Sequence, residues 1–69
     1  MLTHADITQY DVVRLADGRK GTVIEIYTPP NIPIGYEIET YDKEDETWDM
    51  FTVTIEQIKE VVWKMPSQL

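Results

Sequence analysis

The chain has 69 residues, 42% of them hydrophobic, and its 13 acidic residues against six basic ones give a formal net charge of -7. This length allows one domain, and the hydrophobic fraction excludes intrinsic disorder. The absence of cysteine excludes disulfides and thiolate metal sites. No segment has the pattern of a signal peptide or an apolar run of about 20 residues, so we expect a cytoplasmic protein without a membrane partner.

The first half of the chain has the alternating pattern of β-strands. Residues 1–9 lack this pattern, and we expect them to form a weakly ordered lead-in. Residues 10–15 and 22–27 are the first two predicted strands. An Asp-Gly dipeptide between them favours a tight turn, and Gly21 allows a bulge or a positive φ. These features predict a hairpin, with Arg19 and Lys20 at its exposed tip.

The middle of the chain contains a loop and a second hairpin. Three prolines make residues 28–35 a loop, because proline lacks the N–H that a central strand needs. Residues 36–42 and 48–53 alternate as third and fourth strands. The polar segment 43–47 joins them as the hairpin tip.

The last part of the chain changes its period. Thr54 is a candidate N-cap of a short helical turn, with Gln57 as its capping-box partner. Residues 59–64 are compatible with a longer helix or with a fifth strand, and the paired valines with Trp63 favour the strand. We expect residues 64–69 to form a tail.

Together these elements predict an all-β fold for a single domain over residues 1–69. Five short antiparallel strands, with one short helical turn before the last, are typical of a small SH3-like barrel. The alternative is a small open β-sheet with one C-terminal helix packed across it.

The chain resembles a small bacterial family catalogued as domain of unknown function 4926. The likeness extends from about residue 10 to residue 61, and it departs in a shorter first turn and in the proline-rich loop. It rests on the segment VTIEQI and on these residues: Tyr10, Asp11, Val12, Val13, Leu15, Gly21, Thr22, Val23 and Tyr27. The resemblance implies an SH3-like fold and carries no activity. Residues 21–23 are also similar to the turn of KOW-type elements, which bears on the fold alone.

Enzymatic chemistry has little support in this sequence. His4 is the only histidine and lies in the lead-in, so no nucleophile–base arrangement is evident. Glu37 and Glu39 share a strand face, but paired carboxylates need a pocket that separates their pKa values, and a small barrel fills its interior. We therefore expect a non-enzymatic protein with no catalytic residues and no cofactor.

Metal and nucleic-acid binding also have weak signals. Residues 42–46 are rich in carboxylates but lack the glycine of a calcium loop, so we expect a solvated hairpin tip and no specific metal site. Arg14, Arg19 and Lys20 could form a small basic patch near Tyr10 and Tyr27. Three cations in a chain of this net charge fall short of a DNA interface, which makes weak nucleic-acid binding through the first hairpin turn a less favoured function.

The aromatic residues give the more useful signal. Phe51 shares a face with Val53 and is expected in the core, while Trp48 and Met50 share the opposite face, with Tyr41 across from them. Outer aromatics beside a variable loop often bind extended peptides in SH3-like folds. The predicted protein-binding residues are Tyr27, Ile32, Ile34, Tyr36, Tyr41 and Trp48. For the two isoleucines the other interpretation is that they fold back over one end of the barrel.

The leading hypothesis is therefore a small acidic protein-interaction module that binds a partner or itself, with the acidic hairpin attracting a basic partner. The alternative hypothesis is that its carboxylates mimic nucleic acid, as in an inhibitor or immunity factor. The acidic patch comprises Glu37, Glu39, Asp42, Glu44, Asp45, Glu46 and Asp49.

Overall fold

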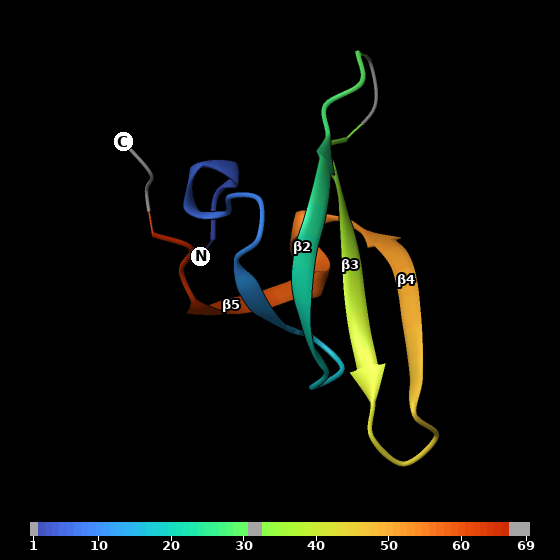
Figure 1. Cartoon of the computed structure of the whole chain (residues 1–69). Coiled ribbons are helices and arrows are strands. Elements are labelled where there is room, and N and C mark those ends of the chain that lie inside the picture. Colours follow the sequence, from blue (N-terminus) through green and yellow to red (C-terminus); the bar gives the residue numbers. More distant parts are fainter. Residues whose placement is uncertain (1, 31–32, 67–69) are drawn as a thin grey trace.

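The computed structural model describes residues 2–30 and 33–66, and its main feature is one antiparallel sheet with the strand order β4-β3-β2-β1-β5 (Figure 1). The elements in chain order are η1 (His4–Asp6), β1 (Val12–Leu15), β2 (Lys20–Tyr27), β3 (Gly35–Asp42), β4 (Thr47–Val53), η2 (Ile55–Gln57) and β5 (Ile58–Trp63). Both η elements are single 3₁₀ turns. Among the described residues, no helix has the length and apolar character needed to cross a membrane.

The sequence prediction of the fold class is confirmed. The protein is all-β, its five strands are antiparallel, and a helical turn precedes the last strand. Thr54 precedes this turn as its N-cap and forms the predicted capping box with Gln57. Residues 59–64, for which the sequence was compatible with a helix or a strand, lie in β5 except for the last. In the described part of the chain the ladder does not join β4 to β5, so the sheet keeps two edges and closure into a barrel is not seen.

The core lies between β2–β4 and the pair β1–β5, which crosses them in Figure 1. Every strand contributes at least one side chain that is at most 5% exposed, since alternate residues point inward. The buried hydrophobic residues are Ile7, Val13, Leu15, Val23, Tyr36, Ile38, Val53 and Ile58. Phe51 is half-buried and packs against this cluster. The far end of the β3–β4 hairpin lies beyond the core, and residues 41–50 are all exposed.

The N-terminal segment has more structure than its sequence pattern indicated. Asp6 accepts hydrogen bonds from the backbone N–H and the hydroxyl of Thr3 and so caps η1. Ile7 then enters the core with 3% of its surface exposed. Residues 67–69 of the expected tail lie outside the described residues.

A fully buried carboxylate connects this segment to the end of the chain. Asp11 accepts hydrogen bonds from the N–H and hydroxyl of Thr8, at 2.8 and 2.9 Å. The Lys64 ammonium and the Met65 N–H donate to the same carboxylate, each at 2.8 Å. Burial alone raises the pKa of Asp11, but these hydrogen bonds outweigh it and hold the pKa below its ordinary value of 3.8.

The two glycines of the first hairpin have different roles. Gly18 is in the left-handed region, with φ of 96°, and open space surrounds the position of its missing Cβ. Gly21 does not have a positive φ. This conformation was one of the two reasons that the sequence suggested for a glycine at this position. A Cβ there would clash with Cγ2 of Ile38 and lie 2.9 Å from the carbonyl oxygen of Glu39. Gly21 is therefore needed for the close approach of β2 to β3.

We expect Gly21→Ala to lower the free energy of unfolding by about 2 kcal/mol, because backbone and core atoms of β3 must move to admit the methyl group. Gly18→Ala should lower it by about 1 kcal/mol, since only its left-handed φ opposes a side chain. Urea unfolding followed by tryptophan fluorescence measures both. A smaller loss for Gly21→Ala than for Gly18→Ala would contradict the close-approach explanation.

We expect Asp11→Asn to lower the free energy of unfolding by about 2 kcal/mol at pH 7, because one buried acceptor oxygen becomes an NH2 group that faces the donors of Thr8, Lys64 and Met65. The folded-state pKa is lowered, so this stabilisation is complete above the unfolded value of 3.8 and is lost as the pH falls through the folded pKa. The difference between variant and wild type should therefore shrink below that pH in urea titrations. Asp45→Asn, at the exposed hairpin tip, is the control, and an equal loss in both variants would contradict the prediction.

Candidate functional site

The surface of β2–β4 that faces away from the core, called here the outer face, gathers three of the six predicted protein-binding residues: Tyr27, Tyr41 and Trp48. Alternation along β3 sends Tyr36, Ile38 and Thr40 inward, so Glu37, Glu39 and Tyr41 point outward. The β3–β4 register places Trp48 opposite Tyr41 and Met50 opposite Glu39. The outer face therefore combines aromatic and acidic side chains from neighbouring strands.

An aromatic pair occupies the hairpin end of the outer face. The ring centroids of Tyr41 and Trp48 are 4.7 Å apart, with an angle of 51° between their planes. The two residues are 46% and 65% exposed, and Met50 beside them is 55% exposed. The predicted contact between Tyr41 and Trp48 is confirmed. Such large exposed apolar surfaces at adjacent positions are typical of interaction sites.

A shallow groove of about 520 Å³ runs from this pair across the sheet. Tyr41 and Trp48 line one side, while Val62 and Trp63 of β5 line the other. Trp63 is 49% exposed and was missed as a candidate, because it reaches the groove through the pairing of β5 with β1. The sequence left residues 59–64 open between helix and strand, so it did not indicate which of their side chains would line this groove.

Three carboxylates lie in the middle of the outer face. Glu25 and Glu37 are directly opposite each other on β2 and β3, and Glu39 follows Glu37 on the same face. Like charges at opposite positions of an antiparallel pair are destabilising. The Tyr27 hydroxyl donates to Glu37, and this hydrogen bond, with burial and the two carboxylates, raises the pKa of Tyr27.

The loop end of the outer face has an apolar hollow of about 450 Å³. Tyr27, Pro29, Pro33 and Thr52 are among the residues that line it. Tyr27 is 44% exposed. Ile34 instead packs against the core, as the second interpretation of that residue proposed. Ile32 lies outside the described residues.

The prediction of Tyr36 as a surface anchor is wrong. Its side chain is 1% exposed and belongs to the core. Its hydroxyl is hydrogen-bonded to Nδ1 of His4, and the two rings stack with centroids 5.9 Å apart. The alternation that buries Ile38 and Thr40 also buries Tyr36, so proximity to the proline-rich loop was a misleading guide.

The acidic patch does not form one array. Asp42 accepts hydrogen bonds from the N–H groups of Glu44 and Asp45 and so shapes the hairpin turn. Asp49 is opposite Thr40, whose side chain points to the core side of the sheet, so it lies on the other face from Glu37 and Glu39. In the described part of the chain, no group of three or more acidic, histidine or cysteine side chains has the geometry to hold a metal ion.

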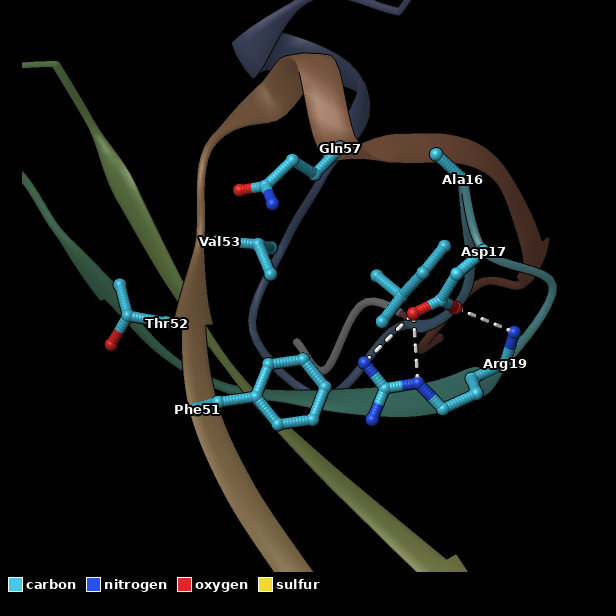
Figure 2. A pocket seen from close by; sticks show the side chains of 8 residues that line it. Ala16, Asp17, Arg19, Phe51, Thr52, Val53 and Gln57 are labelled. Carbon is cyan, nitrogen blue, oxygen red and sulfur yellow. Dashed lines mark hydrogen bonds and ion pairs between the residues drawn. The ribbon is translucent and has the colours of Figure 1, made fainter.

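The cations of the first hairpin are paired with carboxylates. Arg14 contacts Glu60 at 3.1 Å, and Arg19 contacts Asp17 at 2.8 Å. Figure 2 shows Arg19 between Asp17 and Phe51 in the lining of a small hollow. The hollow has a volume of about 210 Å³, and Val53 also lines it. The Arg19 guanidinium lies 4.5 Å from the centre of the Phe51 ring. Arg14 thus connects β1 to β5, and Arg19 contacts β4 through the Phe51 ring. Of these three cations only Lys20 lines the groove, together with Lys43 of the second hairpin.

We expect Glu25→Gln to raise the free energy of unfolding by about 0.5 kcal/mol, because it removes the like-charge pair with Glu37. The gain should shrink as salt is added, since salt screens exposed charges. Urea unfolding at low and high salt measures it. Glu56→Gln is the control, because hydrogen bonds at η2 favour the ionised form of Glu56 and lower its pKa. An equal gain in both variants would contradict the role of the opposing pair.

Comparison with known proteins identifies the family of this chain. The family model described as domain of unknown function (DUF4926) matches residues 2–60. No curated protein and no solved structure matches the chain. The match covers most of the chain and agrees with the resemblance found in its sequence. The chain therefore belongs to the DUF4926 family.

Proposed function

We propose that this chain is a non-enzymatic protein-binding module whose outer face takes a cationic segment of a partner protein. This proposal rests on one combination of side chains. The aromatic pair Tyr41 and Trp48 is exposed, and outward carboxylates of β3 lie between this pair and Tyr27. Aromatic faces and carboxylates both attract lysine and arginine side chains, by cation–π interaction and by charge.

The charges of the outer face favour a cationic partner. Glu25 and Glu37 repel each other in the free protein, and Glu39 adds a third carboxylate on the same face. A bound cation would relieve this repulsion, so the complex would gain free energy that the isolated chain lacks. The net charge of -7 also speeds the encounter with a basic partner.

The dimensions of the outer face suit an extended segment. From Gly35 to Tyr41 the outward positions of β3 span about 20 Å, at roughly 3.3 Å per residue. Apolar surface lies at both ends, with Tyr27 and the prolines at one and the aromatic pair at the other. A strand-like segment of about six residues would reach both ends, with cationic side chains over the carboxylates between them.

The other two functions have weaker support. A nucleic-acid mimic needs its carboxylates on one surface, but Asp49 lies on the opposite face from Glu37, and Asp42 is engaged in the turn. Nucleic-acid binding by the first hairpin needs free cations, but Arg14 and Arg19 are in ion pairs.

The test is affinity capture from cell lysate with the wild-type chain and with the Tyr41→Ala, Trp48→Ala double variant, read by mass spectrometry. We expect wild type to retain a specific set of basic proteins that the double variant loses. With a purified partner, the affinity should fall about thirtyfold, since an aromatic hot spot contributes about 2 kcal/mol. It should also fall as salt rises, because the carboxylates are exposed.

The control is Tyr10→Ala, which removes a side chain of similar exposure (49%) from the segment before β1. It should retain the same proteins as wild type. Both substitutions in the double variant are at exposed positions beyond the core, so its fold should persist and circular dichroism can verify this. Identical captured proteins for wild type and the folded double variant would overturn the proposal.

A further inference from the structure

The free edge of β4 offers a second kind of contact beside the outer face. We infer that a second basic stretch of the partner, next to the one on the outer face, pairs with β4 and becomes a sixth strand of the sheet, an inference that rests on the proposed protein-binding function. An edge strand presents a row of backbone N–H and C=O groups that an extended chain can pair with. β4 is such an edge, because β3 is its only neighbour in the sheet of the described residues (Figure 1).

The two edges of this sheet differ in how they are protected against strand addition. β5 carries Lys59 within the strand, and its pairing with β1 shifts register twice. Lysines and bulges are the usual means by which proteins block an open edge. β4 pairs with β3 over seven consecutive residues without a shift, and the strand TWDMFTV contains neither lysine nor proline. Its one charge, Asp49, opposes pairing with an acidic or neutral strand but not with a basic one. The edge at β4 is therefore the one more open to a basic strand.

The side chains of β4 would contact an added strand on both of its faces. Trp48 and Met50 point to the outer face and are more than half exposed, so neighbouring side chains of the added strand would cover them. Asp49 points to the other face and is also exposed. A lysine or arginine opposite Asp49 would form a cross-strand pair of opposite charge.

The charge of the edge selects a cationic segment over a second copy of this chain. Two β4 strands paired antiparallel about their middle would bring the two Asp49 carboxylates within about two residues of each other. Each copy also carries a net charge of -7, so the two chains repel each other. A basic strand replaces both repulsions with attraction. A dimer at low salt is therefore an outcome that would contradict this choice of occupant.

The probe is a capped ten-residue peptide of alternating lysine and valine, titrated into the intact protein at low salt. We expect tryptophan fluorescence and the amide spectrum to report binding at Trp48. Strand addition further predicts that alternate amides of β4, those that point away from β3, exchange at least tenfold more slowly with the peptide bound. Docking through side chains alone leaves the exchange of these amides unchanged.

A peptide of alternating lysine and proline carries the same charge but has lost half of its N–H donors and cannot form a regular strand. We expect it to bind at least tenfold more weakly. Binding of both peptides with equal affinity, or binding without slower exchange in β4, would overturn strand addition and leave the proposed function intact. The absence of binding by either peptide would overturn both.

A matched pair of variants locates the contact. Thr52→Lys gives β4 the kind of residue that protects β5, and it should weaken binding of the lysine–valine peptide at least tenfold. Thr22→Lys adds the same charge to the outer face of the interior strand β2 and should weaken binding only two- to threefold. Equal losses in the two variants would show that charge alone acts, and would overturn strand addition.

Discussion

The buried carboxylate of Asp11 is the interaction on which the rest of the structure depends. It lies just before β1, and its hydrogen bonds join the N-terminal segment at Thr8 to the residues after β5 at Lys64 and Met65. A buried charge is tolerated only where it is fully paired, so these segments must stay together for the carboxylate to stay buried. Ile7 can then complete the core beside β1. One ionised side chain thus holds both flanks of the shortest strand in place.

This arrangement separates the part of the molecule that provides stability from the part proposed to bind. The hydrogen bonds of Asp11 lie around β1 and the end of β5, the core lies between this pair and β2–β4, and the close approach at Gly21 fixes β2 against β3. The β3–β4 hairpin extends away from this region (Figure 1), and residues 41–50 have no buried member. Substitutions on the hairpin can therefore test the proposed binding with little effect on folding, because few core contacts depend on them.

Local pattern in the sequence predicted the strands well, because alternation with period two is a property of consecutive residues. It also predicted the contact of Tyr41 with Trp48, since a hairpin fixes its own register. It failed at Tyr36, where it did not decide which face the first residues after the loop would take. It missed Trp63 and the role of Asp11 for another reason. Both depend on contacts between the two ends of the chain, such as the pairing of Val12 with Trp63, and local sequence carries no signal for that pairing.

The carboxylates of the outer face favour the proposed binding of a cation, because their mutual repulsion destabilises the free protein. Placing Glu25 opposite Glu37 weakens the isolated sheet, and a neutral residue at either position would remove the repulsion. The hydrogen bond from the Tyr27 hydroxyl offsets part of it. A cation bound at this place would convert the remaining repulsion into attraction, whereas it would gain less at an isolated carboxylate. The affinity of such a partner would then have a salt-sensitive part from the carboxylates and a salt-insensitive part from Trp48, Met50 and the backbone of β4.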